Sequence, residues 1–152
     1  MRKSDLTLKQ AYFSQLIGWI EANLSAELNI DTITDKSGYS KWHMQRLFKD
    51  YTGETLANYT RKRRLTQSAM ALRKTRLSIL DIAIRYGFNT QQHFTRVFKS
   101  HFHQTPAAYR RASQTDDSAL YCPFGGTAIP EPQLPAWMMN NADEKNVEKS
   151  TR

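Results

Sequence analysis

One internal repeat constrains the fold of this chain more than any other feature of its sequence. The stretch HMQRLFKDYTGET, residues 43–55, returns fifty positions later as HFTRVFKSHFHQT, residues 93–105. Upstream the offset is 49, so that Gly38 matches Gly87 and one residue is inserted just after the glycine. Both glycines suit a turn with positive φ between two helices. Each copy therefore reads as a short helix, a glycine turn and a longer helix.

Capping residues support this interpretation of both copies. Ser40 and Thr90 precede the longer helices at matching positions and are predicted N-caps. Ser78 and Asp81 have the spacing of a capping box, and Asn29 can cap the corresponding short helix of the first copy. Helix, short turn and helix form the helix-turn-helix arrangement, and the chain contains it twice.

The chain is predicted to be helical as far as residue 111. Apolar residues recur at helical spacing over residues 10–24, and residues 55–74 read as one continuous helix. No alternating strand pattern of useful length occurs. We predict an all-α chain with two homeodomain-like helix-turn-helix subdomains, at about residues 10–54 and 75–111, joined by a linker helix at about residues 55–74.

Residues 112–152 differ in character from the rest. They hold four of the five prolines and show no sustained periodicity, so we predict a C-terminal tail that is largely disordered. Nothing in the sequence indicates whether Tyr121, Phe124 or Trp137 packs on the helical body.

Positive charge is concentrated in the segment that holds the repeat. The chain carries a net charge of +8, and residues 40–111 alone carry fifteen basic and three acidic side chains. Residues 1–39 carry four basic and five acidic side chains, and residues 112–152 carry three and six. A solvated charged face is the plain alternative. Such a surface usually mixes both signs, however, whereas a surface that binds a polyanion does not.

Helical spacing divides each longer helix into a buried and an exposed face. In the first copy the predicted buried side chains are Met44, Leu47, Phe48 and Tyr51, and the opposite face carries Trp42, Gln45, Arg46 and Lys49. In the second copy the inward set is Phe94, Val97 and Phe98, and the outward set is Gln91, Gln92, Thr95, Arg96 and Lys99. Both exposed faces thus combine glutamine, arginine and lysine.

These exposed faces have the chemistry that reads the major groove of DNA. Arginine can donate two hydrogen bonds to guanine, and glutamine can exchange two with adenine. We predict base contacts by Trp42, Gln45, Arg46, Gln91, Gln92 and Arg96, although a partly covered surface aromatic is the alternative for Trp42. Contacts with the DNA backbone are predicted for Ser40, Lys41, Lys49, Arg61, Thr90, Thr95, Lys99 and Arg110.

Two further features bear on DNA binding. The run RKRR, residues 61–64, is predicted to lie partly on a solvated helix face, with some of its side chains reaching phosphate. A linker helix of about twenty residues spans roughly 30 Å. This length is close to the roughly 34 Å between successive major-groove openings on one face of DNA.

Other kinds of site lack support in the sequence. His101 and His103 do not share a helix face, and with Cys122 they leave a fourth ligand missing, so no metal site is predicted. There is no P-loop, nucleophile motif or dinucleotide fingerprint, so we expect neither an enzyme nor a cofactor. No apolar run approaches the roughly 20 residues that span a bilayer, and no apolar leader is present. With one cysteine, the chain is expected in the cytoplasm.

Two segments, GYSKWHMQRLFKDYTG and YGFNTQQHFTRVFKSHFHQTPAAYRR, resemble the two helix-turn-helix units of the AraC/XylS family of transcriptional regulators, in particular its MarA/SoxS/Rob group. The resemblance covers about residues 10–111 and implies about seven helices in two subdomains. It also implies that bases are read by the residues that match Trp42, Gln45, Arg46, Gln91, Gln92 and Arg96. His93 stands where relatives often have threonine, which predicts altered readout at one base.

The resemblance further implies what such a protein does. A monomer would bind double-stranded DNA at an asymmetric promoter site, contact RNA polymerase and activate stress or multidrug-resistance genes. It would act in the cytoplasm, on the nucleoid. The tail is far too short to be the ligand-binding domain of larger members, so no small-molecule effector is expected.

Three alternatives remain open at this point. A sequence-tolerant architectural DNA-binding protein would need the basic segment but not the glutamine and arginine pattern. An RNA-binding module is disfavoured, because the aromatic residues lie mostly on predicted buried faces and form no stacking platform. A helical protein that binds an acidic partner is the third alternative.

Overall fold

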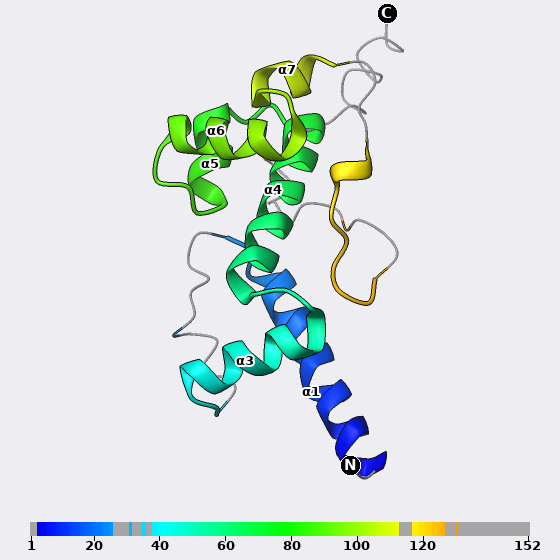
Figure 1. The fold of residues 1–152 in the computed structure, drawn as a ribbon. Coiled ribbons are helices and arrows are strands. Elements are labelled where there is room, and N and C mark those ends of the chain that lie inside the picture. Colours follow the sequence, from blue (N-terminus) through cyan, green and yellow to red (C-terminus); the bar gives the residue numbers. More distant parts are fainter. Residues whose placement is uncertain are drawn as a thin grey trace, which may run out of the picture. The chain divides into compact units, whose positions relative to one another are not determined.

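Most of the described residues lie in helices. The computed structural model describes residues 3–25, 31, 35, 38–112, 117–126 and 130, with side chains from residue 10 onward (Figure 1). These residues contain no strand, and the helices among them are α1 (Lys3–Ala22), α3 (Lys41–Thr52), α4 (Leu56–Lys74), α5 (Ile79–Arg85), α6 (Gln91–Phe102), α7 (Pro106–Arg111) and the 3-10 helix η1 (Asp117–Ala119). The predicted all-α fold class is confirmed.

The chain forms two compact units, and α4 contributes to both of them. Unit 1 consists of the described residues within Met1–Thr66 and Ser118–Pro130, and unit 2 of those within Gln67–Asp117. Unit 1 contains α3 and unit 2 contains α6, so each unit holds one longer helix of the repeat. Leu56 and Tyr59 of α4 are buried in unit 1, whereas Leu72 is buried in unit 2. The predicted linker helix therefore also supplies core side chains to each unit.

The apolar face predicted for the first helix is buried in unit 1. Its five residues cluster with two from α3 and two from α4, namely Phe13, Leu16, Ile17, Ile20, Leu24, Met44, Phe48, Leu56 and Tyr59. Helix α1 begins at Lys3, earlier than the predicted start at about residue 10. The short helix predicted before Gly38, with its Asn29 cap, lies outside the described residues except for Asp31 and Asp35.

A chain of aromatic rings runs through the core of unit 2. Phe94, Phe98 and Phe102 follow one another at four-residue spacing on α6 and are all buried. The ring centroids of Phe98 and Phe102 are 4.5 Å apart, and Tyr109 of α7 lies 5.3 Å from the first and 5.4 Å from the second. This packing ties α7 to α6 and determines which side of α6 can face solvent.

The basic run at residues 61–64, predicted to lie partly on a solvated helix face, is exposed at Arg61 alone. Arg63 is fully buried in unit 1, where Nε donates to Glu21 Oε2 at 3.0 Å and one amino group donates to Oε1. Its other amino group donates to the backbone carbonyl of Tyr121. Lys62 pairs with Glu54, and only Arg61 of the four is exposed. A buried guanidinium must be paired, so most of this run supports the fold.

Part of the predicted disordered tail is docked on unit 1. The Tyr121 backbone N–H donates to the buried hydroxyl of Thr66 at 2.9 Å, and the Phe124 N–H donates to the Tyr59 hydroxyl at 2.9 Å. Because Tyr59 and Thr66 are about two turns apart, the segment is held along α4. Residues 117–126 are therefore ordered, near the start of the tail that was predicted to be largely disordered. Trp137 lies outside the described residues.

The buried ion pair yields a prediction about stability. We expect Glu21→Ala to lower the free energy of unfolding of unit 1 by about 3 kcal/mol, because the buried Arg63 charge loses its carboxylate. Urea unfolding followed by circular dichroism measures this change. Asp31→Ala is the matched control, since it breaks a 3.4 Å pair with Lys41 in which both side chains are mostly exposed. That control should cost at most about 1 kcal/mol, and equal losses would contradict the assignment.

The two longer helices end in the same backbone conformation with different residues. Gly53 and His103 hold matching C-cap positions with φ of 82° and 64°. Each donates its N–H to the carbonyl four residues earlier, that of Lys49 or Lys99, at 2.8 Å. The left-handed conformation costs a residue that has a Cβ roughly 1–2 kcal/mol, whereas glycine adopts it freely.

This difference predicts opposite effects of two substitutions. His103→Gly should raise the free energy of unfolding by about 1 kcal/mol, because the relieved strain exceeds the entropy that glycine adds to the unfolded chain. Gly53→Ala should lower it by about 1–2 kcal/mol. Thermal unfolding of each variant measures both changes. A loss of stability in His103→Gly would mean that contacts of the imidazole outweigh the strain.

Candidate nucleic-acid interface

Helix α3 is fixed by a cap at its first turn and by packing of its apolar side on the core of unit 1. Ser40 has an extended backbone, and its Oγ accepts a hydrogen bond from the His43 N–H at 3.2 Å, which confirms the predicted N-cap. The side that faces the unit 1 core carries buried Met44 and Phe48 with half-buried Leu47 and Tyr51. Burial along one side leaves the opposite side of the helix to solvent.

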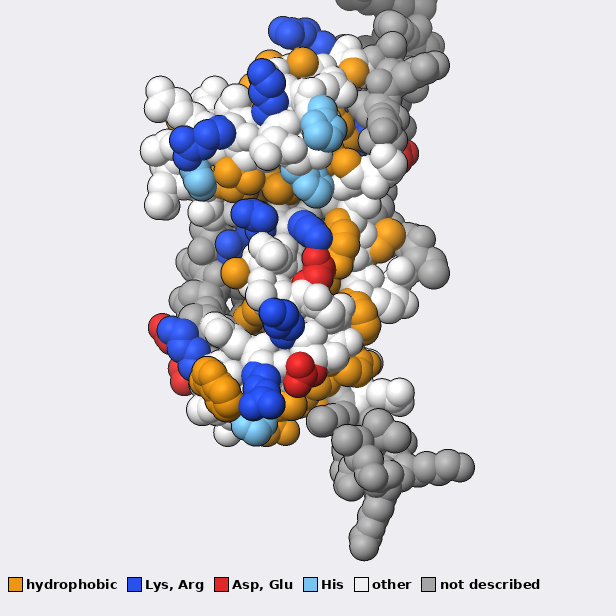
Figure 2. Space-filling view, viewed as in Figure 1, with side chains coloured by type: hydrophobic (Ala, Val, Ile, Leu, Met, Phe, Trp, Pro, Cys, Tyr) orange, Lys and Arg blue, Asp and Glu red, His pale blue; other side chains and the backbone are white. Residues whose placement is uncertain are grey.

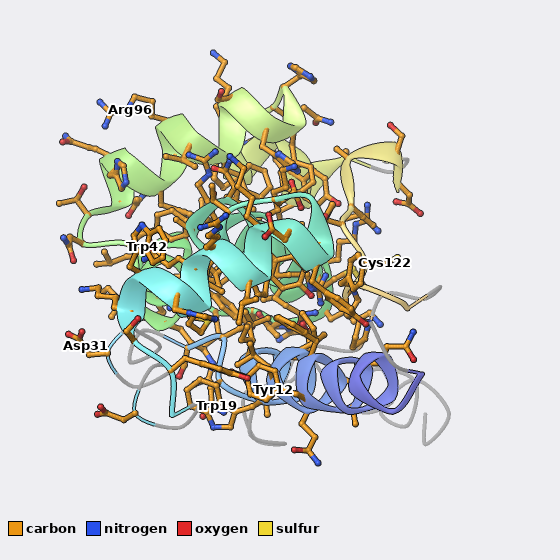
Figure 3. All side chains as sticks on the ribbon, turned by 60° about the horizontal axis from the view of Figure 1, so that its bottom comes forward. Tyr12, Trp19, Asp31, Trp42, Arg96 and Cys122 are labelled. Atoms are coloured by element: carbon orange, nitrogen blue, oxygen red, sulfur yellow. The ribbon has the colours of Figure 1, made fainter. Side chains whose placement is uncertain are left out.

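The exposed side of α3 carries the residues predicted to contact bases in unit 1. Trp42 is 67% exposed, which is unusual for tryptophan, and Gln45, Arg46 and Lys49 are exposed beside it. The guanidinium carbon of Arg46 lies 5.4 Å from the centre of the Trp42 ring, within cation–π range. Figure 3 shows where Trp42 lies on the first turn of this helix.

A shallow hollow beside α3 includes residues that the sequence analysis missed. It is lined by Trp42, Gln45, Arg46 and Lys49, together with Thr55, Leu56 and Ala57 at the start of α4. The repeat contained a signal for this, because Thr55 matches Thr105 at the offset of 50. Both threonines cap the helix that follows, through the N–H of Asn58 at 3.2 Å and of Ala108 at 3.1 Å.

Helix α6 repeats this arrangement in unit 2. Thr90 Oγ1 accepts a hydrogen bond from the His93 N–H at 3.0 Å, which confirms the second predicted N-cap. One hollow is lined by exposed Gln91, Gln92, Arg96 and Lys99 and by half-buried Thr95. Arg96 is labelled in Figure 3 and extends outward from the helix. The structure thus brings together the side chains that were predicted to contact bases in each unit.

His43 and His93, which match in the repeat, lie in the first turn of α3 and of α6. The Tyr39 ring stacks on His43 with centroids 5.1 Å apart and planes 5° from parallel, and Phe88 packs on His93 at 5.8 Å. His93 Nδ1 also lies 3.0 Å from an amino nitrogen of Arg96, whereas Arg46 in the other unit lies over Trp42. A different neighbour therefore contacts the exposed arginine in each unit.

The side chains predicted to contact the DNA backbone occupy different environments. Lys49, Lys99 and Arg61 are exposed, and Lys41 is exposed next to Asp31. Thr95 is half-buried, and the hydroxyls of Ser40 and Thr90 serve as helix caps. The exposed cations are therefore the ones in reach of a bound polyanion without rearrangement of the fold.

Arg110 has a role within unit 2 that the sequence analysis missed. Its Nε donates to the carbonyl of Leu72 at 3.0 Å, and an amino group donates to the carbonyl of Thr75 at 3.4 Å. Burial lowers the pKa of Arg110 from its ordinary value. The guanidinium satisfies carbonyls at the end of α4, where a positive charge also interacts favourably with the helix dipole.

The chemistry of the two hollows is that of a polyanion reader. Neither lining contains a carboxylate, and both combine amide, guanidinium and ammonium groups. In Figure 2, Lys and Arg are prominent among the charged side chains of each unit. Such groups attract phosphate and match the acceptors on base edges.

Two other kinds of site find no basis in the described residues. Nowhere in residues 38–112 and the other described positions do three His, Cys, Asp or Glu side chains gather to hold a metal ion. None of the described helices combines the length and apolarity needed to cross a membrane.

Comparison with known proteins bears on the repeat directly. Residues 33–112 match a family described as a helix-turn-helix domain. The chain is 49% identical over 121 residues to the transcriptional regulator Rob of Salmonella typhimurium, covering 78% of this chain and 42% of Rob. It is 50% identical over 110 residues to the probable transcription factor PqrA of Proteus vulgaris, covering 71% of this chain and 90% of PqrA.

The chain thus spans less than half of Rob but most of PqrA. It is also 42% identical over 109 residues to the multiple antibiotic resistance protein MarA of Escherichia coli, covering 72% of this chain and 86% of MarA. A solved structure of an AraC-type DNA-binding regulator from Chromobacterium violaceum has a TM-score of 0.61 and 32% identity, covering 66% of this chain and 90% of that one.

The family match and these relatives all cover the part of the chain that holds the two helix-turn-helix copies. They are regulators of transcription, and no enzyme is among them. The chain therefore belongs to the AraC/XylS family of helix-turn-helix transcriptional regulators, which bind DNA, and within it to the MarA/SoxS/Rob group.

Proposed function

We propose that this regulator activates transcription by reading an asymmetric promoter site with α3 and α6, each inserted into one of two adjacent major grooves. The observation that carries the proposal is the exposed Gln, Arg and Lys set that recurs in both units: Gln45, Arg46 and Lys49, and Gln92, Arg96 and Lys99. A general polyanion binder needs the charge of this set but not its glutamines, which add directional donor and acceptor pairs.

The base contacts are proposed from the chemistry of each side chain. Arg46 and Arg96 are suited to the O6 and N7 acceptors of guanine, and Gln45, Gln91 and Gln92 to the donor and acceptor pair of adenine. Trp42 offers a flat apolar surface to a thymine methyl group or to the sugar backbone. Because its ring lies against Arg46, it also limits the directions in which this guanidinium can point.

Contacts with phosphate would hold each helix in register. Lys49, Lys99 and Arg61 are exposed and can reach the backbone of a bound duplex, and so can Lys41 if it leaves its exposed partner Asp31. Ser40 and Thr90 lie at the start of α3 and α6, where backbone N–H groups and the helix dipole also favour phosphate, and Thr95 lies about one turn into α6. Arg110 is the weaker candidate for a phosphate contact, since it already donates to two backbone carbonyls.

The regulatory role rests on the relatives. MarA is named for multiple antibiotic resistance, and PqrA is described as a probable transcription factor. We propose that this chain likewise acts on stress or multidrug-resistance genes, as a monomer on the nucleoid, through contact with RNA polymerase. The asymmetry between the two exposed faces, one with Trp42 and one with two adjacent glutamines, favours an asymmetric site.

Selection of sites from a randomised DNA duplex pool, at near-physiological salt, tests the proposal. Salt at this level is essential because non-specific phosphate binding otherwise masks discrimination. Two short, different blocks about one helical turn apart are expected. Enrichment of one block would reduce the proposal to one reading helix. A pool without enrichment would leave the architectural, sequence-tolerant alternative in its place.

Replacement of single side chains provides a sharper prediction. Arg46→Ala should weaken binding to the selected duplex by about 1–3 kcal/mol and relax preference at one base pair. Lys49→Ala is the matched control on the same helix face, and should weaken binding to all sequences alike while it reduces the salt dependence. Titration of duplexes that carry each base at each position measures both. Equal behaviour of the two variants would contradict base reading by Arg46.

A further inference from the structure

The docked C-terminal segment touches the end of the recognition helix in unit 1. The Tyr121 hydroxyl donates a hydrogen bond to the carboxylate of Glu54, which directly follows the C-cap of α3. Lys62 donates to the same carboxylate, and its Nζ lies 5.0 Å from the centre of the Tyr121 ring. Figure 3 shows Trp42 near one end of α3 and Cys122, the neighbour of Tyr121 in the sequence, near the other.

A relay of hydrogen bonds connects Glu54 to the last turn of α3. The hydroxyl of Thr52 donates to the Phe48 carbonyl at 2.8 Å, and the Glu54 N–H donates to the same hydroxyl at 3.2 Å. Phe48 is fully buried and cannot shift without disturbing the core of unit 1. Tyr121 is thereby linked through Glu54 and Thr52 to the residue that anchors the recognition helix.

A second path reaches α3 through aromatic packing. The Phe124 ring lies 5.3 Å from the ring of Tyr51, in the final turn of α3. Tyr51 in turn stacks on Phe13 of α1, with centroids 4.3 Å apart and planes 9° from parallel. Tyr51, at the end of α3, therefore contacts both α1 and the docked segment.

The protonation states of Glu54 and Tyr121 near neutral pH favour the hydrogen bond between them. Burial alone would raise the pKa of Glu54, but hydrogen bonds from Lys62 and Tyr121 outweigh it and hold the pKa below its usual value. Burial, together with the bond to Glu54, raises the pKa of Tyr121. The carboxylate and the phenol are thus in the states that the hydrogen bond requires.

The second copy of the repeat lacks the side chains for this arrangement. At the offset of 50, Gln104 stands where the first copy has Glu54, and Ala112 stands where it has Lys62. The ion pair that receives Tyr121 in unit 1 cannot form at these positions. A contact of this kind thus serves one of the two recognition helices.

We propose that residues 118–126 form a C-terminal brace, in which Tyr121 and Phe124 are positioning residues that set the orientation of α3 for base reading. The inference rests on the proposed function, in that α3 must read bases for its orientation to matter. A loss of the brace should loosen readout by unit 1 and leave readout by α6 intact.

Hydrogen exchange of the full chain tests the brace without any DNA. In the double variant Tyr121→Ala, Phe124→Ala, the backbone amides of Thr52, Gly53 and Glu54 should exchange about tenfold faster, while those of α6 keep their rates. Tyr121→Phe keeps the ring and removes the hydroxyl, so it should show a smaller change at the same amides and covers the case of a double variant that does not fold. Cys122→Ala, between the two contact residues, is the matched control.

The second test measures the base preference of the same variants, which would not change if Tyr121 and Phe124 only stabilised the fold. The variants should lose part of the roughly 5- to 150-fold discrimination of one base contact, at the base pairs that Arg46→Ala relaxes and not at those that Arg96→Ala relaxes. A uniform loss of affinity with unchanged preferences, or unchanged exchange at the end of α3, would overturn the proposal. If Arg46→Ala relaxes no base pair, the proposed function fails, and exchange alone decides whether the brace holds α3.

Discussion

The rotation of each recognition helix about its own axis is the constraint on which the candidate DNA surface depends. A helix turns by about 100° per residue, so a slip of one residue would carry Arg46 or Arg96 off the exposed side. Phe48 in α3 and Phe98 in α6 prevent this, because each is fully buried and packs on a tyrosine ring, Tyr59 and Tyr109 respectively. The exposed polar residues can be replaced without disturbing this packing, whereas these aromatic residues cannot be replaced without loss of the surface.

Features determined by nearby residues were predictable from the sequence. The caps at Ser40 and Thr90, and the division of both helices into buried and exposed sides, depend on spacing within one or two turns. The buried state of Arg63 was not predictable, since it depends on Glu21, 42 residues away, and on Tyr121, 58 residues away. The docking of the tail was not predictable for the same reason. The partners of Tyr121 and Phe124 are distant in the sequence, and composition alone does not indicate them.

The two copies of the repeat share their caps and core positions but differ in what supports them. Helix α3 ends at Gly53, whereas α6 ends at His103 in the same left-handed conformation. In unit 1 the exposed Arg46 lies over the indole ring of Trp42, whereas in unit 2 the exposed Arg96 lies next to an imidazole nitrogen of His93. The two copies thus share the caps and buried positions that orient α3 and α6, while the surroundings of these two helices differ.

The contacts of Tyr121 have a consequence for the order in which the chain can complete its structure during synthesis. Thr66 and Tyr121 are 55 residues apart, and the sequence between them contains nearly all of unit 2. At about 5–20 residues per second, a ribosome needs roughly 3–11 s to cover that distance. Throughout this interval the guanidinium of Arg63 lacks its carbonyl acceptor and the hydroxyl of Thr66 lacks its donor. Among the described residues, those made last, from residue 118 onward, therefore belong to the unit whose synthesis began first.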